Sequence, residues 1–322
     1  MKQFIIRRIL LSILILFGVS IILYALIRSM PGDYVTSITA GNPNVTPETI
    51  LRLKKLYGLD TGIIEGYIKW LGQALRGNFG ESFIFKRPVT EIISSKMWIS
   101  FSLAFTAFVI QIIIAVPLGI ISATKQYSKL DYFVTIFALF GISLPSFFFA
   151  AVLQRIFAIG LGILPLQGMV TARYDYKGFR LILDIAKHFV MPIMVFVVTG
   201  IGGLMRYSRG NMLEVLSADY VRTARAKGLS ENKVIYKHAF RNTLIPIVTM
   251  IGGSIPGLFT GAVITEGIFA IDGLGSTGLL AMRQGDIPFI MAFNIFIAVM
   301  TLLGTLISDI LYAVVDPRVR LS

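Results

Sequence analysis

The sequence contains no cysteine and only two histidines, His188 and His238. Without cysteine, the chain has no disulfides, no thiolate metal ligands and no cysteine nucleophile. Two histidines also exclude a histidine-rich metal site. Charged residues are scarce too, at 15% of the 322 residues, whereas a typical soluble domain carries about 25%. These absences argue against a metalloenzyme and against an ordinary water-soluble domain.

Motifs of the common catalytic sites are absent as well. The sequence lacks the phosphate-binding pattern G-x-x-x-x-G-K-[ST] and has no Gly-Lys pair, so it contains no Walker nucleotide site. It also lacks H-E-x-x-H and G-x-S-x-G, the patterns of zinc peptidases and serine hydrolases. We therefore predict no catalytic, cofactor-binding or metal-binding residue in this chain, and we do not expect it to be an enzyme.

Long apolar runs dominate what is present, with 55% hydrophobic residues and a mean hydropathy of +0.78. About 20 consecutive apolar residues can cross a bilayer as a helix, which satisfies its own backbone hydrogen bonds there. Six segments of the sequence qualify: Ile9–Ile27, Trp98–Ala123, Tyr132–Leu153, Phe189–Met205, Leu244–Thr265 and Phe289–Val315. The first run is longer than the apolar part of a signal peptide, so we expect it to be retained. The sequence predicts an all-α polytopic membrane protein with six transmembrane helices.

The distribution of Lys and Arg predicts how these spans are oriented. Six spans place both termini on one side, and that side receives short basic stretches at both ends of the chain and the eight Lys and Arg of residues 206–242. The other side carries as many, but most lie in the long loop 28–96, and long loops cross the membrane largely regardless of charge. We expect cytoplasmic N- and C-termini in a cell membrane. The net charge of +13 thus reflects topology and lipid contact, not nucleic-acid binding.

This topology divides the chain into four parts. Residues 1–27 form the N-terminal tail and first span, and residues 28–96 form an extracytoplasmic loop region. Residues 97–315 form the core membrane domain with a cytoplasmic loop at 206–242, and residues 316–322 form a cytoplasmic tail. The loop 28–96 contains two stretches with helical apolar spacing, and Thr46 followed by Pro47 predicts the start of one of them.

Polar and helix-breaking residues inside the spans are few. Gln111 and Asn294 are more typical of hydrogen bonds between helices than of solute ligands. We expect Asp309, far along the last span, near the cytoplasmic interface. A proton-driven carrier commonly needs buried ionisable residues, and the span interiors offer little of that kind. Prolines interrupt several spans and can reflect ordinary helix packing, which we favour, or helices broken around a solute path. These prolines are Pro145, Pro192, Pro246 and Pro256.

The basic segment "SADYVRTARAKGLSENKVIYKHAFRN" begins at Ser217 and ends at Asn242. The sequence predicts Ser217 as the N-cap and Asp219 in the first turn, where the helix dipole stabilises an acidic side chain. Gly228 is well placed as a left-handed cap at the end of that helix, and Ser230 can cap a second helix. The sequence predicts a short helix, a sharp turn and a second helix that continues into the fifth span.

Helical spacing places Tyr220, Val221 and Ala224 on one face of the first short helix. A rigid helix and turn suits insertion into the groove of a partner protein. An amphipathic loop resting on anionic lipid headgroups fits the same pattern. The residues alone leave these two interpretations open.

The stretch "DYVRTARAKGLSENKVIYKHAFRN" resembles the signature cytoplasmic loop of ABC importer permeases. Arg222-Thr223-Ala224 occupy the place of Glu-Ala-Ala in many relatives, and Gly228 matches the signature glycine. The residues after Gly228 depart from the wider family in the manner of the dipeptide and oligopeptide (and nickel) subgroup. "RSMPGD", "YIKWLGQALRGNFGESF", "GAVITEGIFAIDGLG" and "DILYAVVDPRVR" also resemble the B-type permease of that subgroup. Differences at Thr61-Gly62 and at Ile271-Asp272 concern the local shape of the outer loops.

The resemblance implies a type I importer permease fold and a set of partners. These would be a homologous second permease, two cytoplasmic ATPases that bind ATP and magnesium, and an extracytoplasmic solute-binding protein. The short cytoplasmic helix would dock on an ATPase and transmit its closure to the membrane helices. That role is expected of Asp219, Tyr220, Val221, Arg222, Thr223, Ala224, Arg225, Ala226, Lys227 and Gly228.

We expect the chain to be one membrane subunit of an ATP-driven peptide importer. The loops 33–96 and 266–287 would receive the binding protein, and the solute path would pass small polar side chains of the third and fifth spans. The residues expected to line that path are Ser143, Ser146, Thr260 and Thr265. Nickel chelates, glutathione and oligosaccharides stay open as alternative cargo. An ATP-independent channel or ion-coupled carrier is the alternative from another class.

Overall fold

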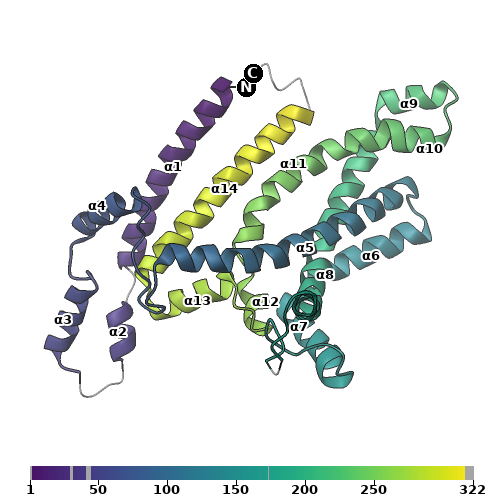
Figure 1. Cartoon of the computed structure of the whole chain (residues 1–322). Coiled ribbons are helices and arrows are strands. Elements are labelled where there is room, and N and C mark those ends of the chain that lie inside the picture. Colours follow the sequence, from purple (N-terminus) through teal and green to yellow (C-terminus); the bar gives the residue numbers. More distant parts are fainter. Residues whose placement is uncertain (1, 30–31, 41–44, 173, 316–322) are drawn as a thin grey trace. The chain divides into compact units, whose positions relative to one another are not determined.

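The computed structural model describes residues 2–29, 32–40, 45–172 and 174–315. Within these ranges the chain is helical, and the one β-type pairing is an isolated bridge between Glu81 and Pro88. The predicted all-α class is confirmed (Figure 1). The helices are α1 (Lys2–Ser29), α2 (Tyr34–Thr39), α3 (Pro47–Leu56), α4 (Ile63–Ala74), α5 (Val89–Thr124), α6 (Lys129–Ser143), α7 (Ser146–Leu153), η1 (Gln154–Gly160), α8 (Phe179–Ser217), α9 (Asp219–Ala226), α10 (Glu231–Lys233), η2 (Val234–Ala239), α11 (Phe240–Phe259), α12 (Val263–Ile268), α13 (Leu274–Gln284) and α14 (Ile287–Val315).

Five helical stretches in the described part of the chain are long and apolar enough to cross a membrane. They contain α1, α5, α8, α11 and α14 and correspond to the first, second, fourth, fifth and sixth predicted spans. The predicted cytoplasmic tail, residues 316–322 with Arg318 and Arg320, lies outside the described residues. The sixth crossing depends on α6 and the helix that follows it.

The third span is not the single helix Tyr132–Leu153 that its hydropathy predicts. The chain bends by 99° between α6 and the helix Ser146–Gly160. Leu144 adopts an extended conformation, with φ −81° and ψ 119°, and Pro145 follows it. Proline clashes with a helical conformation of the residue before it, so α6 ends at Ser143 and Leu144 is its extended C-cap. At 15 residues, α6 is about 22 Å long, which is shorter than a hydrocarbon core of about 30 Å.

The other prolines do not break their helices. Pro192 lies inside α8, and Pro246 and Pro256 lie inside α11. The amide of Gln111 on α5 donates to the carbonyl oxygen of Phe196 on α8 at 2.7 Å, which confirms its expected role between helices. The amide of Asn294 donates to the carbonyl of Ile290 in the same helix at 2.8 Å, and its expected role between helices stays a prediction.

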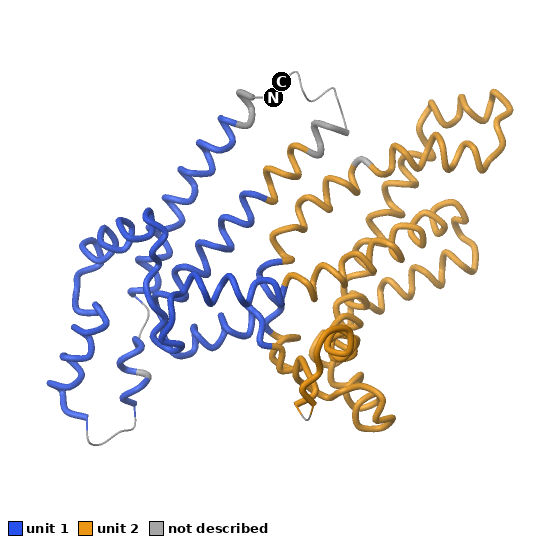
Figure 2. The backbone as a smooth tube through the Cα atoms, viewed as in Figure 1, with its two compact units in different colours: residues 1–100, 259–263, 272–303 blue, residues 101–258, 264–271, 304–322 orange. Residues whose placement is uncertain are grey.

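The described chain forms two compact units (Figure 2). Unit 1 contains residues 1–100, 259–263 and 272–303, and its apolar core is built from the start of α5, α13 and the start of α14. Unit 2 contains residues 101–258, 264–271 and 304–322, and its core joins α5, α6, α8, α9, η2 and α11. The boundary runs through α5 and α14, so both units share spanning helices and neither is a separate soluble domain.

Helices α6 and α8 of unit 2 approach each other closely because glycine lies at the contact. A Cβ at Gly202 of α8 would clash with the carbonyl oxygen of Ala138 on α6, and one at Gly141 would clash with that of Val198. Small residues permit such backbone contact in membranes, where van der Waals packing holds helices together. The broken third span is therefore fixed tightly against α8.

Helices α3 and α4 of the loop 28–96 form where its apolar spacing predicts helices. Thr46 is the N-cap of α3, where its side chain accepts a hydrogen bond from the backbone N–H of Thr49 at 3.3 Å, and Pro47 is the first helical residue. Helix α4 covers the second patterned stretch, and α2 is an additional short helix that the spacing does not reveal.

Candidate functional site

The segment Ser217–Asn242 folds as a helix, a turn and a second helix, as its sequence predicts. Helix α9 begins at Asp219, whose carboxylate lies in the first turn, 3.5 Å from the guanidinium of Arg222. Gly228 has a φ of +75°, the left-handed conformation expected of its position. Ser217 differs from its prediction: it is the last residue of α8, Ala218 is the N-cap, and the Ser217 hydroxyl donates to the carbonyl of Glu214.

Helix α9 has one face buried in its own chain and one face exposed. Val221 is fully buried, and Ala224 is 6% exposed; both belong to the apolar core of unit 2 with Met212, Val234 and Ala239. Tyr220 does not share their face as the spacing suggested, because its side chain is 45% exposed. The other predicted coupling residues are exposed, so a partner can reach them. They are Asp219, Tyr220, Arg222, Thr223, Arg225, Ala226, Lys227 and Gly228.

An ion pair across the turn holds α9 against the helix that follows. The guanidinium of Arg225 makes two hydrogen bonds to the carboxylate of Glu231, at 2.6 and 3.2 Å. These bonds raise the pKa of Arg225 above its usual value. Both side chains are exposed, so the pair stabilises the fold by about 1 kcal/mol or less. Its two hydrogen bonds link the end of α9 to the start of α10 across the turn at Gly228.

The chain returns from this turn through η2, a π-helix of six residues. A π-helix has a wider turn than an α-helix and frequently occurs at functional sites. In the first turn of α11, the buried hydroxyl of Thr243 donates to the carbonyl of Ala239, the last residue of η2, at 3.1 Å and contacts the sulfur of Met212 at 3.2 Å. The base of α11 is thereby attached to α8, directly behind α9.

The structure also contains a buried ion pair that the sequence did not reveal. The guanidinium of Arg209 on α8 donates two hydrogen bonds to the carboxylate of Asp131 on α6, both at 2.9 Å. Asp131 is 4% exposed. It also accepts hydrogen bonds from the Ser122 hydroxyl on α5 and the backbone N–H of Tyr127. The Asp131–Arg209 pair thus joins α5, α6 and α8 ten residues before α9 begins.

The four residues predicted to line a solute path lie in both units. Ser143 and Ser146 flank the break at Pro145, and the first is exposed while the second is half-buried. Thr265 belongs to α12 of unit 2 and is 4% exposed. Thr260 belongs to unit 1 and is half-buried. The position of Ser143 and Ser146 at a broken helix resembles the geometry of solute sites in transporters, and the role of all four stays a prediction.

In unit 1, an aspartate fixes the loop before α5 to the turn before α14. Asp286 is fully buried, and its carboxylate accepts hydrogen bonds from the Ser82 hydroxyl at 2.5 Å and the backbone N–H groups of Phe83 and Ile84 at 3.1 and 3.2 Å. It also accepts from the N–H of Phe289 in the first turn of α14 at 3.3 Å. The residues 80–89, which we call the outer hairpin, are therefore held rigidly.

The tip of the outer hairpin rests on an aromatic cluster. Lys86 has a φ of +51°, uncommon for a residue other than glycine. Its ammonium donates to the Tyr57 hydroxyl at 3.0 Å and lies 4.8 and 5.3 Å from the ring centroids of Tyr57 and Tyr34. The hydrogen bond to Tyr57 raises the pKa of Lys86. Contacts to two rings offset the backbone strain at Lys86.

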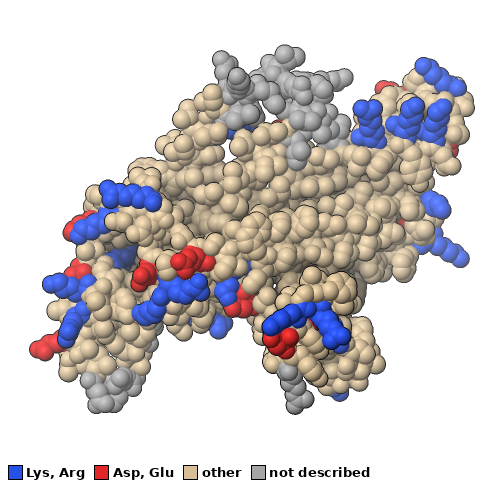
Figure 3. Space-filling view, viewed as in Figure 1, with Lys and Arg blue, Asp and Glu red and all other residues tan. Residues whose placement is uncertain are grey.

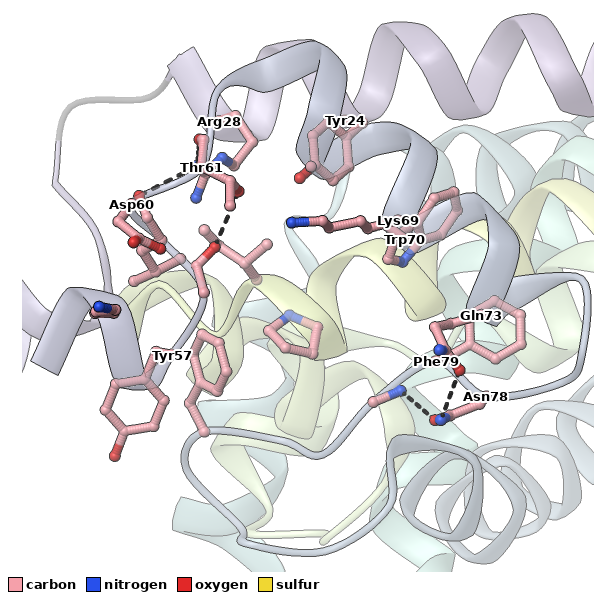
Figure 4. A pocket seen from close by; sticks show the side chains of 18 residues that line it. Tyr24, Arg28, Tyr57, Asp60, Thr61, Lys69, Trp70, Gln73, Asn78 and Phe79 are labelled. Atoms are coloured by element: carbon pink, nitrogen blue, oxygen red, sulfur yellow. Dashed lines mark hydrogen bonds between the residues drawn. The ribbon is translucent and has the colours of Figure 1, made fainter.

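A cavity of about 570 Å³ lies beside this cluster in unit 1 (Figure 4). Its wall combines the aromatic side chains of Tyr24, Trp70 and Phe79 with the cationic side chains of Arg28 and Lys69. The Arg28 guanidinium is engaged, because it donates to the backbone carbonyls of Leu59 and Thr61. Across the described part of the chain, no group of three or more His, Asp or Glu is arranged to hold a metal ion.

Comparison with known proteins places these features in a family. Residues 115–321 match the family model described as the binding-protein-dependent transport system inner membrane component, and residues 1–104 match the model of its N-terminal part. The chain is 38% identical to the oligopeptide transport system permease protein AppB of Bacillus subtilis over 99% of this chain and 100% of that protein. It is 34% identical to the dipeptide transport system permease protein DppB of Lactococcus lactis over the full length of both.

A third relative is the oligopeptide transport system permease protein OppB of Haemophilus influenzae, 33% identical over 99% of this chain and 100% of that protein. The similarity therefore covers both units, including α9, the outer hairpin and the broken third span. The chain belongs to the family of inner membrane components of binding-protein-dependent transport systems.

Proposed function

We propose that this chain is one of two permease subunits of an ATP-driven importer of peptides. The relatives that it matches over their full lengths are named as oligopeptide and dipeptide permeases. The sequence has no Walker motif, so the energy would come from separate ATPase subunits that bind ATP and magnesium. An extracytoplasmic binding protein would deliver the peptide. Both termini and α9 would face the cytoplasm, as the distribution of basic residues predicts.

The observation that carries this proposal is that α9 is buried on one face and exposed on the other. Its inner face, at Val221 and Ala224, belongs to the core that also contains α8 and η2. Its outer face carries Tyr220, Arg222 and other exposed polar side chains, and tyrosine and arginine are enriched where interfaces bind most strongly. Figure 3 shows Lys and Arg gathered over α9 and α10. A partner that moves α9 therefore also moves α8 and α11.

The division of labour can be tested with purified proteins. The chain alone, in detergent or liposomes, is expected to hydrolyse no ATP and to take up no peptide. Adding the second permease, the ATPases and a peptide-loaded binding protein is expected to restore both activities. Sustained ATP turnover by the isolated chain would overturn the subunit proposal, and uptake driven by an ion gradient would support a carrier instead.

Replacing Gly228 by valine is expected to uncouple ATP hydrolysis from import. A Cβ at this position meets no other atom within 4 Å, so the effect comes from backbone strain at φ +75°. A β-branched residue is strongly disfavoured in that conformation, at a cost of roughly 1–3 kcal/mol. The turn would relax and α9 would change direction. The measurement is peptide import together with ATP hydrolysis in the reconstituted complex.

Gly228→Asn is the matched control, because asparagine tolerates the left-handed conformation. It is expected to retain most of the import activity. Both variants should be present in the membrane at wild-type amounts, since Gly228 is exposed and outside the core. Import by Gly228→Val at the wild-type rate would contradict the coupling role of α9.

A further inference from the structure

Helix α4 has three distinct faces along its 12 residues. Gly66, Tyr67 and Trp70 point toward α1, and the side chains of Glu65 and Lys69 form an exposed ion pair on a second face. The third face is apolar and exposed: Ile64 is 77%, Ile68 63% and Leu75, directly after the helix, 80% exposed. The positions 64, 68 and 75 stack on one side of a helix with 3.6 residues per turn.

The contacts with α1 place α4 at the depth of the bilayer. The Tyr67 hydroxyl is hydrogen-bonded to the Ser20 hydroxyl at 2.9 Å, and the Tyr67 ring also contacts Phe17 and Tyr24. Ser20 lies seven residues before Ile27, the end of the apolar run of α1. At 1.5 Å per residue, Tyr67 reaches about 10 Å below the point where α1 leaves the hydrocarbon. A helix packed there is surrounded by lipid on any side that protein does not cover.

The side chains around α4 match the chemistry of a membrane interface. Tyr24, Tyr67 and Trp70 form a group of aromatic rings with centroids 5.6 to 6.1 Å apart, and Trp and Tyr are enriched at the level of lipid headgroups. On the polar side, Lys69 lines the cavity and points into it in Figure 4. Helix α1 is itself exposed and apolar on the side away from α4, where Ile22 is 60% and Leu26 59% exposed.

We propose that α4 is an interfacial membrane helix, embedded in the leaflet opposite the N-terminal end of α1, with Ile64, Ile68 and Leu75 in contact with phospholipid acyl chains. Burying side chains of this size in hydrocarbon is favourable relative to leaving them in water. The helix then braces the outer end of α1, and only its polar side remains for the outer loop. This inference goes beyond the transport function and does not depend on the cargo.

The absence of cysteine makes the proposal directly testable, because a single cysteine introduced into this chain can be spin-labelled before assembly with no background from the chain itself. The variants are Ile68→Cys on the apolar face and Glu65→Cys on the polar face, whose side chains are similarly exposed, at 63% and 62%. Ile22→Cys on α1 is the lipid-facing reference. Each is reconstituted with the full complex in vesicles of phosphatidylethanolamine and phosphatidylglycerol. Collision with oxygen and with a water-soluble nickel chelate is measured by electron paramagnetic resonance.

The label at position 68 is expected to match that at position 22, with frequent oxygen collisions and several-fold fewer nickel collisions than at position 65. Nickel collisions at position 68 as frequent as at position 65 would place this face in water and overturn the proposal. Shielding from both reagents would mean that a protein partner covers the face, which also overturns it. If Ile68→Cys does not assemble, Ile64→Cys on the same face provides the same test.

Discussion

Replacement of Arg209 by alanine is expected to lower the free energy of unfolding by about 3 kcal/mol, near the lower end for breaking a buried ion pair. The variant leaves the carboxylate of Asp131, which is 4% exposed, without its cation. The hydrogen bonds from Ser122 and Tyr127 remain and compensate in part. The measurement is thermal unfolding of the detergent-solubilised complex, together with the amount of chain recovered from the membrane.

Arg206→Ala is the matched control for this prediction. Arg206 lies on the same helix, one turn earlier, and is exposed, so its loss is expected to change stability by about 0.5 kcal/mol or less. The double variant Asp131→Ala with Arg209→Ala is expected to be more stable than Arg209→Ala alone, because no unpaired charge remains. If Arg209→Ala melts at the same temperature as Arg206→Ala, the Asp131–Arg209 pair does not stabilise unit 2.

The Asp131–Arg209 pair also bears on the proposed mechanism. Arg209 lies eight residues before the end of α8 at Ser217, about 12 Å along that helix, and α9 begins two residues later. A rigid junction of α5, α6 and α8 at that point would make a displacement of α9 move three helices together. Loss of the pair would then reduce import per ATP hydrolysed even in the fraction of complexes that remains folded.

Hydropathy predicted the spans well because the bilayer imposes a length and an apolar composition on each of them. The break at Pro145 was visible as a proline, but proline also occurs inside α8 and α11 without breaking them. A proline inside a helix leaves a backbone carbonyl without its usual hydrogen bond. The helix continues where neighbouring groups satisfy that carbonyl, and a single sequence does not show whether they do. Gly228 and Thr46 were predictable, because turn and cap chemistry is local.

The unpredicted contacts join residues far apart in the sequence. Asp131 and Arg209 are separated by 78 positions, and each also contributes to the charge distribution that sets topology. Nothing in their local context distinguishes a buried pair from two interface charges. Tyr220 illustrates a different limit: Val221 is its neighbour in sequence, and the packing of α8 and η2 decides which of the two is buried.

Replacement of Asp286 by alanine is expected to destabilise unit 1 by about 4 kcal/mol. This is less than the sum of its four hydrogen bonds, at roughly 1.5–3 kcal/mol each to a charged group, because water and local relaxation satisfy part of the freed donors. The substitution removes the acceptor for the Ser82 hydroxyl and for the N–H groups of Phe83, Ile84 and Phe289. The outer hairpin would lose its attachment to α14. Trypsin should then cleave after Lys86 faster than in the wild type, as measured by mass spectrometry of the fragments, whereas the bond after Arg87 resists trypsin because Pro88 follows it.

Asp272→Ala is the matched control, because this aspartate also lies in unit 1 and pairs with Lys96 but is 67% exposed. An exposed pair contributes about 0–1 kcal/mol, so cleavage of the hairpin is expected to stay at the wild-type rate. If the outer hairpin receives the binding protein, Asp286→Ala should also weaken the stimulation of ATP hydrolysis by that protein, while leaving α9 and its turn intact in unit 2. Unchanged cleavage after Lys86 in Asp286→Ala would contradict the anchoring role, since a hairpin held by its other contacts alone would not depend on this carboxylate.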